Sequence, residues 1–287
     1  MTVPAPDSAV TRPSPSPSRS PSPSGSPSPS GPIRRVDVLG VEISAITIPM
    51  AVDEFARWIC EGEQHYTCIT GVHGVIECQS DAELRAIHNA SGLTTPDGMP
   101  MVWASRRAGA TWVQRVYGPD LMLAVCERAV AEGWTFFLYG GREGIPELLE
   151  SRLVTHYPGL RIVGGWSPPF RALTPDEDAA LVDRINGLAP DIVWVGLSTP
   201  KQERWMAAHA GRLHAPVMVG VGAAFDIHAG TLPQAPRWMQ RSGLEWAYRL
   251  FREPRRLWRR YTSIVPRFLW KIARHPPRLL PPGQPPA

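Results

Sequence analysis

The sequence predicts an α/β protein with a doubly wound, mainly parallel sheet and a basic, helical C-terminal appendage. Short apolar runs alternate with amphipathic helical patterns, which is the order expected of βα units. Several apolar runs lead into glycine and then polar residues, as strands do at the binding edge of a parallel sheet. Beyond Pro236 the pattern is helical and strongly basic. These observations indicate Rossmann-like sheets with a helical extension.

The first thirty-odd residues differ from the rest of the chain. Residues 1–32 contain Ser-Pro repeats, SPSPSRSPSPSGSPSPS, with few residues able to build a core. Such a tract cannot offset the entropy lost on ordering, so we expect a disordered tail. It lacks the positive start, apolar run and cleavage site of a signal peptide. We therefore expect this tail, a catalytic α/β domain over residues 33–236 and the appendage over residues 237–287.

Periodicity and turn residues predict the elements in order. Residues 36–43 and 47–49 predict a short opening hairpin, and residues 52–60, which are amphipathic and follow Pro49, predict a helix. The sequence of the appendage predicts helices that are broken at Pro254 and Pro266, because proline lacks the N–H that a helix interior needs. The remaining predictions are strands over residues 66–70, 93–95, 135–139, 161–164, 192–195 and 217–221, and helices over residues 75–89, 100–107, 121–132, 145–157 and 175–187.

Two neighbouring apolar runs end in residues suited to ligand binding. The run 192–195 continues into the polar turn STPKQE, which contains Lys201 and Gln202, and the run 217–221 leads to Asp226. In an open α/β sheet, ligands bind beyond the carboxyl ends of the strands, where helix N-termini offer free N–H groups. The sequence therefore predicts a ligand crevice at these two strand ends.

Composition argues against a membrane-spanning protein and a disulfide-rich one. No apolar run approaches the roughly 18 residues of a membrane span, so we expect a soluble or peripheral protein. The four cysteines lack CxxC spacing, which supports neither a disulfide framework nor a zinc site and is typical of the reducing cytoplasm.

The charge is distributed unevenly. Residues 237–278 hold twelve Arg and Lys against two Glu, a balance of +10, so the net charge of +4 leaves −6 for the rest of the chain. This asymmetry predicts an anionic partner at the basic end. Aromatic residues interleave with the arginines there, and three interpretations stay open: helices packed on the body with a solvated Arg face, an amphipathic surface on anionic membranes, and nucleic-acid binding.

The loop after residues 135–139 is a candidate nucleotide site. It contains Gly140 and Gly141 and opens a helical pattern, so its N–H groups could approach a diphosphate. Its spacing is not GxGxxG, and no acidic residue follows at the distance that a ribose needs. The loop is therefore either a structural turn or a nucleotide site of a type other than that of dehydrogenases.

Two further strand ends carry groups able to do chemistry. Asp97 follows residues 93–95 and could act as a general base, although Pro-Asp-Gly is also an ordinary turn sequence. His73 follows the strand 66–70 and is either a site residue or a hydrogen-bonded structural imidazole. Asp176 and Asp178 form a DxD pattern, but Thr174 and Pro175 before them favour a helix start over a metal site.

The segments together resemble the WecG/TagA/CpsF family of bacterial glycosyltransferases, which is glycosyltransferase family 26. The resemblance spans roughly residues 36–261 and is specific because seven blocks occur in order: TTPDGMPMVW, RVYGPDLM, FFLYGGREG, YPGLRIVGGWSPPF, VGLSTPKQERWM, GVGAAFDIHAG and APRWMQRSGLEWAYRLFREPRRLWRRY.

The resemblance implies an inverting hexosyltransferase that needs no metal or other cofactor. It implies transfer of an N-acetylhexosamine-type sugar, such as N-acetylmannosamine, from a UDP donor to a polyprenyl-diphosphate-linked sugar in cell-surface polysaccharide synthesis. The location implied is the cytoplasm, peripheral at the inner face of the bacterial cell membrane. It implies no nucleic-acid partner. The oligomeric state stays open, with a homo-oligomer as one option.

The family's functional positions carry over residue by residue. The resemblance implies Asp97 as the base, with Thr70, Arg115 and Gln202 beside it, and Asp226 near the donor nucleotide. Many members have an asparagine shortly after the threonine, and here His73 is its candidate replacement, which bears on the choice of sugar. The glycines at 140 and 141 and Lys201 are expected to contact the UDP-sugar. Lipid phosphates are expected to meet Arg249, Arg252, Arg255, Arg256, Arg259 and Arg260.

Two rival functions come from other classes, in addition to the nucleic-acid binding left open above. One is a non-catalytic, membrane-associated, nucleotide-binding adaptor that uses the basic appendage. The other is a nicotinamide-dependent Rossmann enzyme, against which the missing GxGxxG and ribose acid argue.

Overall fold

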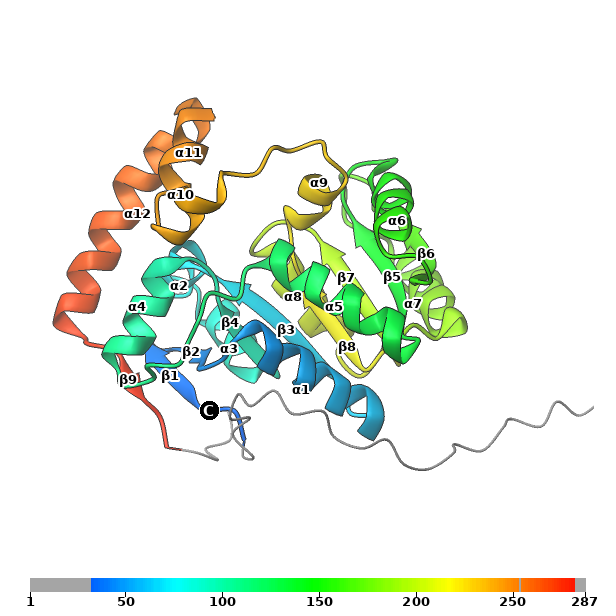
Figure 1. Ribbon diagram of the computed structural model, residues 1–287, viewed down its shortest axis with the longest axis horizontal. Coiled ribbons are helices and arrows are strands. Elements are labelled where there is room, and N and C mark those ends of the chain that lie inside the picture. The colour runs from blue at the N-terminus through cyan, green and yellow to red at the C-terminus, as the bar shows by residue number, and fades with distance from the viewer. Residues whose placement is uncertain (1–31, 253, 282–287) are drawn as a thin grey trace, which may run out of the picture. The chain divides into compact units, whose positions relative to one another are not determined.

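The structure is a computed structural model that describes residues 32–252 and 254–281 (Figure 1). These residues belong to one compact unit. Residues 1–31 of the predicted Ser/Pro tail lie outside the described residues.

A six-stranded parallel sheet forms the centre of the molecule (Figure 1). Its strands lie in the order β4-β3-β8-β7-β5-β6, so β8 is inserted between two strands that precede it in the chain. The apolar runs predicted all six strands, and the Rossmann-like α/β class is confirmed. Their bounds are β3 His65–Thr70, β4 Leu93–Pro96, β5 Thr135–Gly140, β6 Arg161–Trp166, β7 Ile192–Gly196 and β8 Val217–Gly220.

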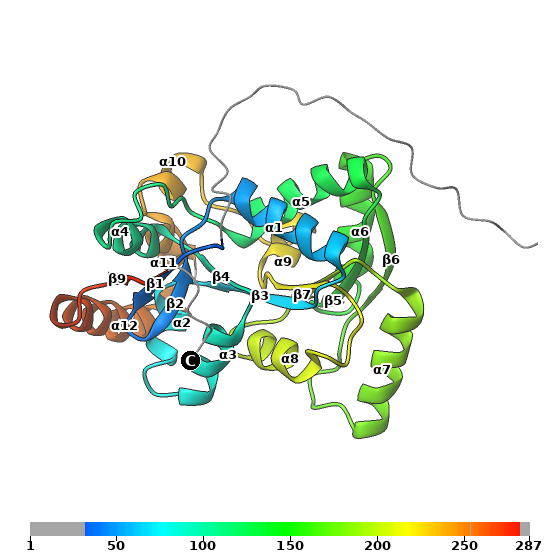
Figure 2. The same cartoon turned by 90° about the horizontal axis from the view of Figure 1, so that it is seen from below.

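Helices cover both faces of this sheet (Figure 2). Alternate side chains of β5 divide between two cores: Phe136 and Leu138 pack toward one face, Phe137 and Tyr139 toward the other. A parallel sheet that is buried on both faces reads as continuous apolar runs, which is why periodicity found these strands. One face carries α1 Ile48–Glu61, α5 Gly118–Glu132, α6 Ile145–His156 and α9 Ala224–His228; the other carries α3 Ala82–Ala90, α7 Pro175–Leu188 and α8 Lys201–His209.

A small antiparallel sheet joins the start of the described chain to its end. Its order is β2-β1-β9, and β9 pairs Leu279 with Val36 of β1. The strands are β1 Arg35–Val38, β2 Val41–Ser44 and β9 Arg278–Leu279, and a third core links them to α2 Val72–Glu77, α4 Met99–Arg107 and α12 Pro254–Arg274. The sequence did not predict β9, because two residues carry no recognisable strand pattern.

Two predicted boundaries near the start of the chain are wrong. The hairpin pairs β1 with β2 directly, and residues 47–49 are not a strand. Thr47 instead caps α1, accepting a hydrogen bond from the Met50 N–H at 3.4 Å, and Pro49 sits in the first helical turn. Proline is tolerated there because the first N–H groups of a helix have no intrahelical partner. Residues 47–49 therefore form the start of a helix and not the second strand of a hairpin.

The predicted single helix over residues 75–89 is two helices, α2 and α3. Asp81 accepts a hydrogen bond from the Leu84 N–H at 2.9 Å and so starts α3 in the middle of the periodic pattern. The predicted break at Pro266 is also wrong, because α12 continues through it. Ile264 and Phe268 on either side are buried in the third core, and their packing outweighs the one backbone hydrogen bond that Pro266 cannot make.

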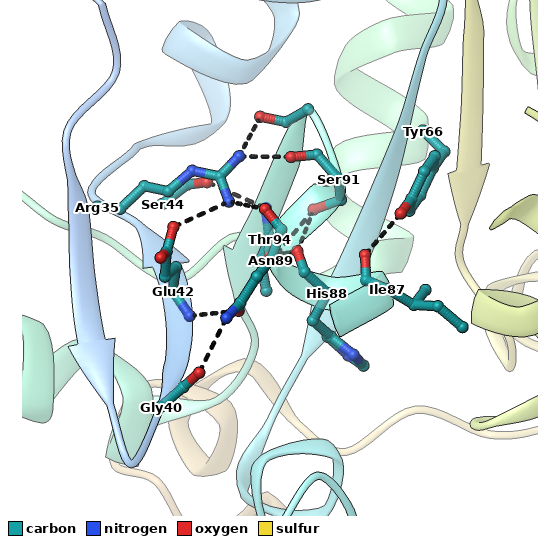
Figure 3. A network of polar contacts seen from close by, with 11 residues as sticks. Arg35, Gly40, Glu42, Ser44, Tyr66, Ile87, His88, Asn89, Ser91 and Thr94 are labelled. Atoms are coloured by element: carbon teal, nitrogen blue, oxygen red, sulfur yellow. Dashed lines mark hydrogen bonds and ion pairs between the residues drawn. The ribbon is translucent and has the colours of Figure 1, made fainter. Parts of the chain in front are cut away.

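Arg35 ties the small sheet to the loop between α3 and β4 (Figure 3). Its guanidinium donates to the carbonyls of Asn89 at 3.0 Å and Gly92 at 3.1 Å, and also to that of Ser91. Glu42 supplies a counter-charge 3.7 Å away. Burial lowers the pKa of Arg35, and Glu42 opposes this shift. Because β4 follows this loop directly, the network holds the start of β4, the strand that precedes Asp97.

We expect Arg35→Ala to lower the free energy of unfolding by about 3 kcal/mol, because it leaves a partly buried carboxylate and three carbonyls without their donor. Urea denaturation at neutral pH measures this loss. The control is Arg57→Ala, whose guanidinium is 40% exposed and pairs with surface glutamates, for which we expect about 1 kcal/mol or less. Equal losses in the two variants would contradict this account of the network.

Candidate active site

A cleft of about 880 Å³ opens at the carboxyl edge of the parallel sheet. The ends of β3, β7 and β8 form its floor, and residues of α2, α5, α8 and α9 form its sides. Residues of α11 Glu245–Arg252 and α12 line the remaining side. The cleft lies where an α/β sheet with this strand order is expected to bind its ligand.

Asp97 lies at the end of β4 beside the end of β3. Its backbone N–H donates to the Thr70 carbonyl at 3.0 Å, which continues the parallel pairing of the two strands by one residue. Its carboxylate is 33% exposed, lines the cleft, and has Oδ1 3.9 Å from Nε of Arg115. A partly exposed carboxylate in a cleft can accept a proton from a bound hydroxyl.

Arg115 connects the cleft to the appendage. Its side chain is 12% exposed, and its guanidinium stacks over the Tyr117 ring at 4.0 Å. It pairs with Glu245 of α11 at 2.5 Å and with the Gln240 side chain of α10 Arg237–Arg241 at 3.3 Å. The sequence pointed to Arg115 but held no signal for Glu245, which lies 130 residues away.

The first turn of α8 places two buried polar side chains against the end of β8. Gln202 is 4% exposed and Glu203 is fully buried. The Gln202 amide donates to the Glu203 carboxylate at 3.1 Å and to the Gly220 carbonyl at 3.2 Å. Burial together with the nearby Glu203 carboxylate raises the pKa of the Cys68 thiol. Sequence reasoning singled out Gln202 and missed its neighbour, although both belong to the same polar turn.

The end of β3 supplies Thr70, and the following helix supplies His73. Thr70 is buried and lines the cleft, and its hydroxyl has no protein partner among the described residues. His73 also lines the cleft, with Nε2 3.4 Å from the Glu77 carboxylate on the same helix. His88 of α3 lines the cleft as well, and sequence reasoning missed it because a helical apolar pattern surrounds it.

On the opposite wall, Asp226 of α9 faces the loop after β5. Its carboxylate is 34% exposed, accepts a hydrogen bond from Thr231 at 3.0 Å, and lies 3.6 Å from the Arg142 guanidinium. Arg142 was not predicted, although it follows directly on the two glycines that were. It brings a cation to the rim of the cleft.

The structure does not bring Gly140, Gly141 and Lys201 to the cleft lining. Gly140 has φ +121°, and a Cβ there would lie 2.7 Å from the Gly196 carbonyl, so glycine is needed for the close approach of β5 to β7. The Gly141 N–H donates to the same carbonyl at 2.9 Å. Lys201 is exposed at the start of α8. Their contact with a UDP-sugar stays a prediction.

The appendage helices pack on the body through one face and expose the other. Leu257, Ile264 and Phe268 of α12 are buried, whereas Trp258 and Trp270 are 61% and 54% exposed. Of the predicted lipid-binding arginines, Arg249 and Arg252 belong to α11 and the other four to α12; Arg252 and Arg255 are exposed. Within the described part of the chain, no helix is long and apolar enough to cross a membrane.

The DxD pattern lies at the start of α7, as predicted. Thr174 and Glu177 form a capping box, and Asp178 pairs with Arg212 at 2.6 Å and His209 at 3.0 Å. Burial acts to raise the pKa of Asp178, but these two partners leave it below its ordinary value. Nowhere in residues 32–252 and 254–281 do three His, Cys, Asp or Glu side chains gather as metal ligands would.

His228 attaches α9 to the start of α5. Its Nε2 donates to the Pro119 carbonyl at 3.0 Å, and burial lowers its pKa below the ordinary 6.5, an effect that the carbonyl opposes only in part. The contact helps to hold α9, which carries Asp226, against the helix that begins near Arg115.

Comparisons with known proteins agree with the resemblance found in the sequence. Residues 36–280 match the sequence model of the Glycosyl transferase WecG/TagA/CpsF family. Proteins from Staphylococcus aureus strains MW2 and NCTC 8325 / PS 47 are 27% identical to the chain over 243 residues, which is 84% of this chain and 92% of theirs. Both are named N-acetylglucosaminyldiphosphoundecaprenol N-acetyl-beta-D-mannosaminyltransferase.

We expect the fold to lose stability as the pH falls from about 6.5 toward the lowered pKa of His228. In that range the unfolded chain binds a proton that the folded imidazole resists, so the free energy of unfolding decreases. His228→Gln keeps a donor for the Pro119 carbonyl but does not titrate, so the loss of stability between pH 7.5 and pH 5 should be smaller in this variant. Urea denaturation at both pH values tests this, and an unchanged loss would contradict it.

Proposed function

The chain belongs to the WecG/TagA/CpsF family of glycosyl transferases, and from this premise we propose that it transfers an N-acetylmannosamine-type sugar from a UDP donor to a polyprenyl-diphosphate-linked sugar. The acceptor in the names of the Staphylococcus aureus relatives, N-acetylglucosaminyldiphosphoundecaprenol, supports this substrate class. The cleft at the carboxyl edge of the sheet has room for both sugars and the nucleotide.

The observation that carries the proposal is the carboxylate of Asp97 beside Arg115 in this cleft. In the proposed step, Asp97 takes the proton of the acceptor hydroxyl while that oxygen bonds to the anomeric carbon of the donor. The bond from this carbon to the UDP oxygen breaks as the new one forms, so the configuration inverts. The electron pair of the broken bond leaves with UDP.

The leaving diphosphate gains negative charge, which fixed cations can stabilise. We propose that Arg115 and Arg142 supply this charge, so that the step needs no metal. Glu245 supports Arg115 in this role by holding its guanidinium from the side of the appendage. Thr70, His73 and Gln202 would orient the sugars, and Asp226 would contact the nucleotide.

We further propose that the appendage binds the cytoplasmic face of the membrane, from which a polyprenyl-linked acceptor would reach the cleft. Exposed aromatic residues such as Trp258 and Trp270 suit the depth of lipid headgroups, and Arg252 and Arg255 suit anionic phosphates. Leu257 and Ile264 of the same helix line the cleft, so a membrane on the exposed face would lie close to the reaction.

We expect Asp97→Asn to abolish sugar transfer, because an amide cannot accept the proton of the acceptor hydroxyl, while UDP affinity stays within about threefold. Turnover against a panel of UDP-sugars with a short-chain prenyl-diphosphate-linked acceptor measures the first effect, and calorimetry with UDP the second. The control is Asp53→Asn on the exposed side of α1, which should keep wild-type turnover. Wild-type transfer by the Asp97 variant would refute its assignment as the base.

We expect the variant Arg252→Glu/Arg255→Glu/Trp258→Ser to lower the affinity for anionic liposomes about tenfold or more, since each basic residue near such a surface contributes about 1 kcal/mol. Co-sedimentation with phosphatidylglycerol vesicles at constant salt measures this. The control is Arg128→Glu on α5, whose guanidinium is 43% exposed. Unchanged liposome binding, or salt-dependent binding of an oligonucleotide instead, would count against a membrane-binding appendage.

A further inference from the structure

Four buried polar side chains line the cleft, and each has an atom without a protein partner among the described residues. Thr70 comes from β3, His88 from α3, and Gln202 and Glu203 from α8, and all four line the cleft. None is more than 4% exposed. The unpartnered atoms are Thr70 Oγ1, His88 Nε2, Gln202 Oε1 and Glu203 Oε2. We call these four residues the acceptor recess, because they present hydrogen-bond acceptors; the name does not refer to the acceptor sugar.

The hydrogen bonds within the protein determine which atoms of the recess remain available to a ligand as donors or acceptors. The Gln202 amide uses its two N–H groups on Glu203 and the Gly220 carbonyl, so its own oxygen is left as an acceptor. One oxygen of Glu203 accepts from Gln202 and from Thr199 at 2.9 Å, which leaves the other oxygen as an acceptor.

His88 adds a third acceptor to the recess. Its Nδ1 lies 2.8 Å from the Leu84 carbonyl, which can only accept, so Nδ1 carries the hydrogen and Nε2 of the neutral ring offers a lone pair. The His88 ring points away from the Arg35 network at the end of α3 (Figure 3). The recess therefore combines three acceptors with one hydroxyl.

Such an arrangement is costly unless a ligand completes it. A buried polar atom without a partner costs about 1–3 kcal/mol, and native proteins keep few of them. Here the fold holds the cluster in place, because Arg204 of α8 pairs with Asp81 at 2.6 Å and with Glu83 at the start of α3. Gly74 leaves room beside the recess, because a Cβ on Gly74 would lie 3.7 Å from His88 Nε2 and 3.0 Å from the Thr70 side chain.

The chemistry of the recess selects its ligand. An anion would be repelled by the Glu203 carboxylate, and an apolar group would leave all four atoms unmatched. Adjacent hydroxyl groups of a saccharide ring are neutral and offer several donors within a small volume. The recess also adjoins the reaction site, because the Thr70 carbonyl accepts from the Asp97 N–H.

We propose that the acceptor recess binds hydroxyl groups of one of the two sugars and that His88 and Glu203 are specificity-determining residues. This inference rests on the proposed function and deepens it. The donor and the acceptor sugar share the chemistry, so the experiment needs one arm for each.

The test combines variants with monodeoxy sugars in transfer assays. For one sugar, removal of a particular hydroxyl should lower kcat/KM of the wild type about 10- to 100-fold, since a buried acceptor then stays unpaired. Glu203→Gln replaces the carboxylate by an amide of similar size. In this variant, removal of the same sugar hydroxyl should change kcat/KM less than about threefold, because the contact between that hydroxyl and Glu203 is already lost. Deoxy donors and deoxy acceptors, tested separately, tell which sugar is bound.

A matched pair of variants tests His88. His88→Gln can place its amide oxygen near the former Nε2 and should keep discrimination against one deoxy sugar, whereas His88→Asn retains only the donor to Leu84 and should lose it. The control is Glu147→Gln on the exposed side of α6, which should behave as the wild type. Thermal unfolding within about 3 °C of the wild type shows that each variant is folded.

The outcomes separate the inference from the function on which it rests. Suppose that the wild type transfers sugar, and that removing each hydroxyl lowers kcat/KM by the same factor in the wild type, Glu203→Gln and His88→Asn. This result would overturn the role of the recess and leave the glycosyl transfer intact. No transfer by the wild type with any UDP-sugar would refute the proposed function. Saturation-transfer NMR with free N-acetylhexosamines then tests the recess alone: a signal that Glu203→Gln removes supports it, and an unchanged signal refutes it.

Discussion

The parallel pairing of β3 with β4 on one side and β8 on the other brings the candidate site together. Register places Thr70 beside Pro96 and Cys68 beside Gly220, so the strand ends that carry Thr70, Asp97 and the partner of Gln202 lie at one edge of the sheet. These strands are buried on both faces, which makes a shift in register costly. The site depends on this constraint because its residues come from segments far apart in the chain.

The site is built from charges that are paired before any substrate arrives. Arg115 is held by Glu245, Gln240 and the Tyr117 ring, while Arg142 pairs with Asp226 on the opposite wall of the cleft. Such preorganisation lowers the reorganisation that a reacting diphosphate would require. It also couples the appendage to the chemistry, since α10 and α11 supply two partners of one guanidinium. A helix expected to serve for membrane attachment thus also shapes the cleft.

Local sequence signals succeeded where one physical effect dominated. Apolar runs marked the six buried strands, and Thr174-Pro175 marked the start of α7. They failed where two effects competed: the apolar period of residues 75–89 hid the cap at Asp81, and the packing of Ile264 and Phe268 carried α12 through Pro266. The placement of Gly140 was similarly ambiguous, because a glycine required for close strand packing and one required for a phosphate look alike in sequence.

The sequence by itself determined the α/β class, the strand-end residues Thr70, Asp97, Gln202 and Asp226, and, through its ordered blocks, the family. The class and the strand ends follow from periodicity along the chain, whereas Thr70 and the family follow from the resemblance of the ordered blocks. Only the tertiary structure decided that Glu245 holds Arg115, that β9 closes the small sheet, and that His88 and Glu203 line one cleft. Such contacts join residues from distant parts of the chain, and the free energy that selects them comes from packing and burial, which no local pattern encodes.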